Sequence, residues 1–264
     1  MTESISMELT GFLSTYILLL IVGAVFKYCG IDQTKYLIFG SIQMSVQLII
    51  AGYVLLYIFQ SPSPFFIFLY LALMVGFAIY RTLNKNKWLN QRFRWIVAIS
   101  IFLTCTCITL FMLLAVIRKD ILNPQFVIPI SGMLVSATMN GATLALKTFK
   151  EVLTGHRQQI EVLLNVGADP AKILHPFINQ SLETAFLPTM NSMVGMGITA
   201  LPGMMTGQIL AGALPNEAVL YQSTIMIANC SCVCLASFGL LYFGARTLWN
   251  KQLQIMPITL EKVK

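Results

Sequence analysis

The residue types that most often carry covalent chemistry are scarce in this sequence and form no catalytic pattern. The two histidines, His156 and His175, lie in one polar segment without an HExxH pattern or a Cys–His spacing typical of zinc. The sequence contains no GxSxG, no Walker A pattern GxxxxGK[ST] and no GxGxxG. We therefore expect no enzyme activity and no cofactor in this chain. A process driven by ATP would need a partner subunit that binds ATP and Mg.

Residues 161–170, with the sequence EVLLNVGADP, favour docking to a partner over catalysis. The permeases of ABC transporters carry a cytoplasmic EAA-xxx-G loop that seats in a groove of the ATPase. Glu161 and Gly167 keep that spacing, while Val and Leu replace the two alanines. Gly167 is a natural helix stop and Asp169-Pro170 a natural helix start, so we predict helix, tight turn, helix. An amphipathic helix on the inner leaflet is the alternative. The predicted ATPase-coupling residues are Glu161, Gly167, Asp169 and Pro170.

The apolar runs carry essentially no charge, and among their larger polar side chains amides stand out. A proton relay of ionisable groups is therefore unsupported. Amides in hydrocarbon usually pair between helices, but some could line a translocation route. The pair Pro202-Gly203 also interrupts an apolar run, which hydrocarbon tolerates only where protein or a wet cavity covers the freed backbone groups. The candidate route residues are Gln43, Gln47, Asn140, Asn191, Pro202, Gly203, Met205 and Gln208, and further amides are Gln222 and Asn229.

Sulfur-containing side chains offer two interpretations. The methionines around Pro202 could bind a soft metal ion through their thioethers, or could simply fill space in a helix. The cysteines favour the second kind of role, because five of the six lie inside apolar runs. In the series Cys230-x-Cys232-x-Cys234 the middle side chain points nearly opposite to the other two. We therefore predict no metal site at the cysteines.

Apolar runs long enough to cross a membrane dominate the chain. Its 264 residues are 57% hydrophobic and 10% charged, with a mean hydropathy of +0.77. Soluble domains are about 25% charged, so these values exclude most soluble enzymes and predict an integral membrane protein. We expect an all-α, polytopic membrane protein with a single transmembrane permease domain, residues 1–264. The seven expected spans are residues 9–26, 36–59, 65–80, 95–117, 126–146, 191–213 and 219–245.

Basic residues between these runs predict the orientation. The net charge is +7, from 17 Lys and Arg against 10 Asp and Glu. With the N-terminus outside, 15 of the 17 basic residues fall in inner segments at 27–35, 81–94, 147–190 and 246–264. We therefore expect the N-terminus outside the inner (plasma) membrane and the C-terminus inside, with a cytoplasmic coupling segment at 147–190. The excess of basic residues is thus explained by their position beside membrane lipid. We expect no nucleic-acid partner, because the basic patch typical of such proteins is missing.

Three blocks of sequence together resemble one family. They are PGMMTGQILAG at 202–212, followed by Pro215, Ala218 and Tyr221-Gln222; GAT at 141–143; and LLNVGADP at 163–170. The sequence resembles the FetB (YbbM)-type ABC permeases, which are linked with iron export in bacteria and akin to plant aluminium-tolerance permeases. The resemblance implies a permease that pairs with a separate FetA-type ATP-binding subunit, two copies of each.

The resemblance indicates the type of transporter more specifically than the substrate that it transports. Metal ion export, with iron as the first candidate, is the function that it implies. Because the plant relatives have been connected with a nucleotide sugar, transport of a small organic solute by the same machine is the alternative. A third possibility is a membrane scaffold that transports nothing and recruits a partner through its cytoplasmic hairpin.

Overall fold

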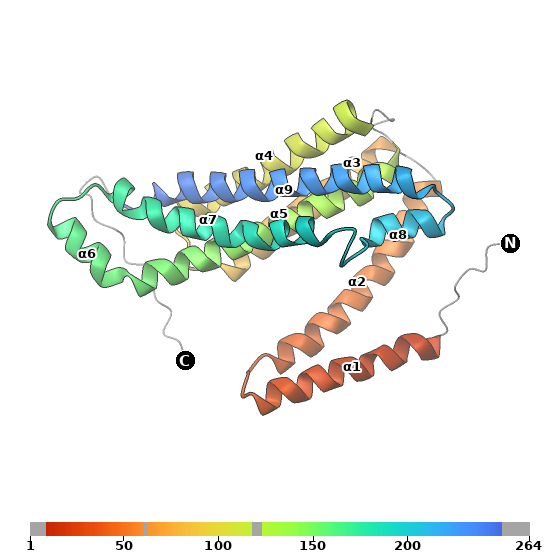
Figure 1. Cartoon of the computed structure of the whole chain (residues 1–264), viewed down its shortest axis with the longest axis horizontal. Helices are drawn as coiled ribbons and strands as arrows, with labels where there is room; N and C mark the ends of the chain where they lie inside the picture. The colour runs from red at the N-terminus through yellow and green to blue at the C-terminus, as the bar shows by residue number, and fades with distance from the viewer. Residues whose placement is uncertain (1–8, 61–62, 118–122, 250–264) are drawn as a thin grey trace. The chain divides into compact units, whose positions relative to one another are not determined.

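The computed structural model describes residues 9–60, 63–117 and 123–249, and these residues form helices joined by short turns (Figure 1). Within the described ranges there is no β-strand, and one isolated bridge joins Met196 and Ala200. The all-α expectation is confirmed. The chain divides at residue 61 into two compact units, each of which is described by itself.

The first unit is a helical hairpin of α1 (Leu9–Tyr28) and α2 (Thr34–Gln60). Gly30 closes α1 with a φ of +68°, and the N–H of Ile31 donates to the carbonyl of Phe26 at 2.9 Å. This left-handed turn is one that glycine adopts at no steric cost. The hydroxyls of Tyr16 and Ser45 hydrogen-bond between the two helices.

The second unit packs long helices around α5 (Pro124–Gly155). Its neighbours are α3 (Pro64–Lys85), α4 (Gln91–Phe111), α7 (Pro170–Gly195) and α9 (Pro215–Ala245). Helix α4 continues into a π-helix, η1 (Met112–Ile117). Two short helices complete the unit, α6 (Arg157–Asn165) and α8 (Gly203–Leu210). In Figure 1, α6 lies at one end of the α5–α7 pair and α8 at the opposite end.

Glycines allow α9 to approach its two neighbours closely. A Cβ placed on Gly141 of α5 would lie 2.7 Å from Cγ1 of Val233 on α9, closer than real carbon atoms approach. A Cβ on Gly239 of α9 would lie 3.0 Å from the hydroxyl of Ser100 on α4. Such contacts between small residues are the usual basis of helix association in lipid. They make α4, α5 and α9 the packed centre of this unit.

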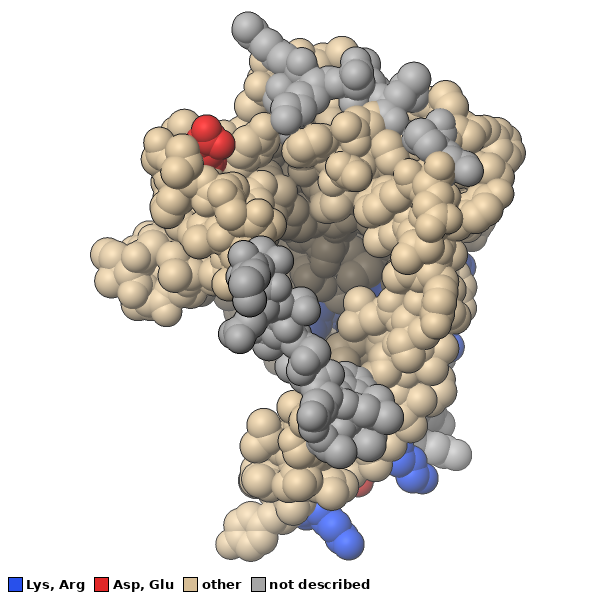
Figure 2. Space-filling view, turned by 90° about the vertical axis from the view of Figure 1, so that its right-hand side faces the viewer, with Lys and Arg blue, Asp and Glu red and all other residues tan. Residues whose placement is uncertain are grey.

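Five of the described helices, α2, α3, α4 through Val116, α5 and α9, are long and apolar enough to cross a membrane. Helix α1 is apolar from Ser14 to Tyr28, a shorter stretch. Most of the face in Figure 2 is free of charge, as the tan colour shows. These observations support a polytopic membrane protein. The expected count of seven spans and the orientation of the termini stay predictions.

The sixth expected span, residues 191–213, is not one helix. Residues up to Gly195 belong to α7, residues 196–202 are not helical, and α8 begins at Gly203 with Pro202 as its N-cap. The helix ends early because Gly197 adopts a φ of +85° and its N–H donates to the carbonyl of Ala200 at 3.0 Å. The interruption is therefore a seven-residue connection, where the sequence suggested a local break at Pro202-Gly203.

The boundaries of the expected coupling segment, residues 147–190, also differ from the structure. Its first nine residues continue α5 to Gly155, and its last part belongs to α7, which runs unbroken to Gly195. Only the stretch from His156 to Asp169 connects the two long helices.

Candidate functional site

The connection between α5 and α7 forms a compact cap at one end of the second unit (Figure 1). His156 joins α5 to α6, and its N–H donates to the carbonyl of Val152 at 3.0 Å. Its ring lies 5.2 Å from the ring of Phe177 on α7, measured between centroids. The cap is therefore held to both long helices at its first residue.

Helix α6 presents three different faces. Ile160 is buried at 5% exposure in the cluster that contains Phe149 of α5 and Leu174 of α7, and Leu164 packs against the same cluster. A second face is polar and exposed, with Glu161 as its charged member; the Nε of Arg157 donates to this carboxylate at 2.7 Å. This ion pair is solvent-exposed on both sides, so it adds little stability.

The third face of α6 is apolar and exposed. Val166 has 81% of its surface exposed and Val162 61%, and Leu163 beside them is also exposed. Ile160, Leu163, Leu164 and Val166 recur in the sequence at the spacing of a single apolar helix face. The structure buries only Ile160 and part of Leu164, because the remaining members point away from α5 and α7. We call Val162, Leu163 and Val166 the valine face.

The turn after α6 has the geometry that the sequence predicts. Gly167 has a φ of +86°, its N–H donates to the carbonyl of Leu164 at 2.9 Å, and the N–H of Ala168 donates to Leu163 at 3.0 Å. These two bonds form a Schellman motif. Asp169 then caps α7 by accepting from the N–H of Ala171 at 3.0 Å, and Pro170 is the first, buried residue of α7. Gly167, Asp169 and Pro170 therefore have structural reasons for their identity, and Glu161 is exposed.

Four of the predicted route residues lie together at α8. Pro202 and Gly203 begin this helix, and Met205 and Gln208 follow as half-buried side chains. Met204 packs against a buried cluster of residues from η1, α5 and α9; its members are Met112, Ile130, Leu134, Ile225, Ala228 and Cys232. The short helix thus packs on α9, and Met205 and Gln208 stay partly accessible.

The other four predicted route residues belong to other helices. Gln43 and Gln47 are on α2 of the first unit, half-buried and exposed respectively. Asn140 is exposed on α5, and Asn191 is exposed near the end of α7. Gln43 and Gln47 thus belong to the first unit, and Asn140 and Asn191 lie on helices of the second unit other than α8.

Two amides on α9 stand out in the structure although the sequence gave them no priority. Gln222 is buried at 7% exposure, and its Oε1 has no hydrogen-bond partner; the Oδ1 of Asn229 is likewise buried without one. They are seven residues apart and so lie on one face of α9, two turns from each other. A buried carbonyl oxygen without a partner costs about 1–3 kcal/mol, and such an atom calls for an explanation. The spacing of seven within an apolar run is the signal that could have singled them out.

The π-helix η1 lies opposite this part of α9. Met112 and Val116 of η1 line a small cavity of about 170 Å³ together with Tyr221, Thr224 and Ile225 of α9. A π-helix within an α-helix frequently marks a functional site. No signal in the sequence indicates η1. Together with α8 and the two amides, it makes this end of the second unit irregular and partly polar.

Cysteines meet at the packed centre of the unit. Cys105 of α4 and Cys232 of α9 are both buried, and the side chain of Thr138 on α5 lies against each of them. Thr138 donates to the carbonyl of Leu134 at 2.7 Å. Within the described residues, His, Cys, Asp and Glu form no group of three or more that could hold a metal ion. Cys105 and Cys232 are buried where α4, α5 and α9 pack closely.

Comparison with known proteins identifies relatives that match most of the chain. Residues 9–249 match a family described as "Uncharacterised protein family (UPF0014)". A UPF0014 membrane protein of Synechocystis is 30% identical over 236 residues, which cover 88% of this chain and 90% of the relative. Escherichia coli FetB, whose name is "Probable iron export permease protein", is 30% identical over 82% of this chain and 83% of its own length. The Arabidopsis thaliana protein ALUMINUM SENSITIVE 3 is 29% identical over 80% and 76%.

No solved structure matches the chain. The resemblance to FetB and to plant aluminium-related proteins, inferred from the three sequence blocks, is confirmed by these relatives. The apolar helices and the named membrane proteins among the relatives make the chain a multi-pass protein of the plasma membrane. The chain therefore belongs to the UPF0014 family.

Proposed function

We propose that this chain is the permease subunit of an ABC transporter that exports a metal ion, with iron as the first candidate. We choose iron as the transported ion because the Escherichia coli relative is named a probable iron export permease. The energy would come from ATP and Mg bound in a separate FetA-type subunit, and two copies of each subunit would assemble. This chain would perform no covalent chemistry.

The observation that carries the proposal is the valine face of α6. Val162 and Val166 are exposed in a connection that begins and ends at long helices, one turn apart on the same side. An exposed apolar surface rimmed by polar residues such as Glu161 and Gln158 is typical of a protein-binding site. We infer that the ATP-binding subunit covers this surface. Because Ile160 of the same helix is buried between α5 and α7, a displacement of α6 would reach both long helices.

The route for the cargo is proposed at the opposite end of the unit, where α8, η1 and α9 meet. The unpaired oxygens of Gln222 and Asn229 would gain partners from a hydrated ion or its water. Met205 and Gln208 of α8 would lie along the same route. A discontinuous helix next to buried polar groups is where transporters commonly place substrate sites.

The proposed topology keeps seven crossings, with the N-terminus outside and the C-terminus inside. The sixth crossing would be made jointly by the end of α7 and by α8, joined by residues 196–202. Two alternatives stay open beside metal export. The same machine could move a small organic solute such as a nucleotide sugar, or the chain could be a scaffold that transports nothing.

Copurification tests the coupling surface directly. The permease and its ATP-binding subunit are expressed together, and the subunit retained on the tagged permease is quantified. Val166→Asp places a charge on the valine face and should reduce the retained subunit at least tenfold. Asn165→Asp adds the same charge on the neighbouring polar face and should retain it. Both positions are exposed, so neither variant should unfold the permease. Equal retention by the two variants would remove the valine face from the interface.

A further inference from the structure

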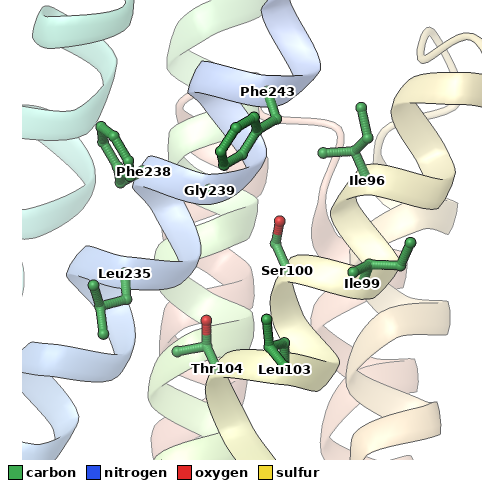
Figure 3. Close-up of a pocket in the computed structure, with 9 residues that line it drawn as sticks. All are labelled: Ile96, Ile99, Ser100, Leu103, Thr104, Leu235, Phe238, Gly239 and Phe243. Carbon is green, nitrogen blue, oxygen red and sulfur yellow. The ribbon is translucent and has the colours of Figure 1, made fainter. Parts of the chain in front are cut away.

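A long apolar groove runs between α4 and α9 on the surface of the second unit (Figure 3). It has a volume of about 540 Å³. Its α4 wall includes Ile96, Ile99 and Leu103, and its α9 wall includes Leu235 and Phe243. Both helices are candidate membrane spans, so the groove faces the hydrocarbon region of the bilayer.

Two small residues lie where the two walls of the groove approach each other. Ser100 of α4 faces Gly239 of α9, and a Cβ on this glycine would lie 3.0 Å from the serine hydroxyl. Figure 3 shows Ser100 in the space between the two ribbons, with Phe243 and Ile96 above it. The upper end in this view is the end at which α4 begins and α9 ends.

That end of the groove is strongly basic. The Nδ2 of Asn90, the N-cap of α4, donates to the carbonyl of Thr247 just after α9 at 2.9 Å. Residues 81–95 contain five Lys and Arg and residues 245–249 one more, with no Asp or Glu in either stretch. Two of these cations lie one or two turns beyond residues that line the groove. Arg92 precedes Ile96 by one turn, and Arg246 follows Gly239 by two, so each continues the groove-facing side of its helix.

Aromatic residues hold the guanidinium of Arg246 in place. Its Nη2 donates to the hydroxyl of Tyr242 at 2.9 Å, and its Cζ lies 4.7 Å from the centre of the Tyr242 ring. Tyr242 in turn stacks on Phe238, a groove residue, with 5.2 Å between ring centroids. One donor bond of Arg246 is used by tyrosine. The remaining donors of this fixed guanidinium can therefore bind an anionic group at the mouth of the groove.

We propose that the groove between α4 and α9 binds one anionic phospholipid. An acyl chain lies along Ile99, Ser100 and Leu103, and the phosphate is bound by Arg92 and Arg246. The arrangement matches the two parts of such a lipid, because an apolar channel within the span ends at a cluster of cations. Basic pockets between spans are typical sites for anionic head groups. The site is independent of the proposed transport, since it uses none of the residues assigned to coupling or to the route.

Native mass spectrometry of the purified full-length chain tests the proposal, because it counts bound lipids and subunits in one spectrum. The probes are phosphatidylglycerol and phosphatidylcholine with identical acyl chains. Each cation near an anionic lipid contributes about fivefold in affinity, so Arg92→Gln with Arg246→Gln should weaken phosphatidylglycerol binding about 30-fold. The same double variant should leave phosphatidylcholine binding unchanged. Lys147→Gln with Lys172→Gln removes two exposed cations from α5 and α7 and should change neither lipid.

The acyl part of the site has its own test. Leu103→Trp fills the groove and should weaken both lipids, whereas Leu114→Trp, on an exposed position of η1, should weaken neither. A preference for phosphatidylglycerol that survives the arginine double variant would overturn the proposal. Equal losses in the lysine double variant would also overturn it, since they would show a general charge effect. A dimer that dissociates in the Leu103→Trp variant, with lipid binding unchanged, would assign the groove to a second copy of this chain instead.

Discussion

The ring of Phe93 on α4 lies directly over the Cα of Gly244 on α9, so that a Cβ at position 244 would overlap the ring. Phe93 is completely buried, and Trp88 packs edge-on against it with 6.0 Å between ring centroids. The contact joins the start of α4 to the end of α9, about one helical turn from the hydrogen bond between Asn90 and Thr247. Any side chain at position 244 must therefore displace a ring that has little room to move.

Gly244→Ala should destabilise the protein by about 1–3 kcal/mol, the usual cost of overpacking a filled core. Gly76→Ala is the matched control, because Gly76 lies inside α3 with no atom within 4 Å of an added Cβ. The control should leave stability unchanged or raise it by up to about 1 kcal/mol through helix propensity. Thermal unfolding of the two purified variants in detergent gives the comparison. Similar melting temperatures for both would mean that α4 and α9 are not in contact at Gly244.

Substitutions of Gly167 test whether the backbone conformation of the turn between α6 and α7 matters for coupling. Its φ of +86° is unfavourable for L-residues, and no atom lies within 4 Å of an added Cβ. Gly167→Val should therefore distort the turn at a cost of about 1–2 kcal/mol without any clash. Gly167→Asn should be tolerated better, because Asn adopts the left-handed region more readily.

The readout for Gly167 is the stimulation of the ATP-binding subunit by the permease in liposomes. We expect the valine variant to lose most of the stimulation while reaching the membrane in normal amounts, and the asparagine variant to keep it. Full stimulation by the valine variant would show that the conformation of this turn does not matter for coupling.

Gln222→Leu separates a structural role from a role in transport. The Oε1 of Gln222 is buried and unpaired, so replacing the amide by an apolar side chain should leave the free energy of unfolding unchanged or raise it. If the amide lines the route, the same variant should lose metal export. Ile225→Leu, a volume-conserving change one turn away on the same face, is the control. It should keep both the stability and the metal export of the unsubstituted protein. A Gln222→Leu protein that is stable and exports normally would remove Gln222 from the route.

The sequence allowed prediction of those segments whose conformation depends only on residues close by in the chain. The turn at Gly167 and the cap at Asp169-Pro170 follow from short-range sterics and hydrogen bonds, and the structure contains both. Long helices such as α4 and α9 follow from uninterrupted apolar sequence.

Features that depend on tertiary contacts could not be predicted in this way. Residues 196–202 are as apolar as a helix, and only the left-handed Gly197 with its bond to Ala200 ends α7 early. The exposure of Val166 depends on how α6 is turned against α5 and α7, which its own pattern does not determine. Gln222 and Gln208 look alike in sequence, and only the packing of α9 buries the Oε1 of Gln222 without a hydrogen-bond partner.

The orientation can be measured with cysteine labelling in intact cells. Cysteines are introduced at Lys87, Gln158 and Glu217, which are exposed, in a background without the exposed Cys29 and Cys107. An impermeant thiol reagent added outside should label position 217 only, because the inner segments carry 15 of the 17 basic residues. Labelling at position 158 from outside would invert the topology and place α6 beyond the reach of an ATP-binding subunit.

Flux in liposomes tests whether this chain moves a metal ion with energy from a partner ATPase. The permease and its ATP-binding subunit are reconstituted together, and ATP-dependent movement of iron and of a nucleotide sugar is measured in parallel. A partner whose Walker A lysine is replaced serves as the control. Iron flux should require ATP and should stop with the altered partner. Flux of the nucleotide sugar without flux of iron would reassign the substrate to a small organic solute. The absence of flux for both would contradict the proposal that this chain is a transporter subunit.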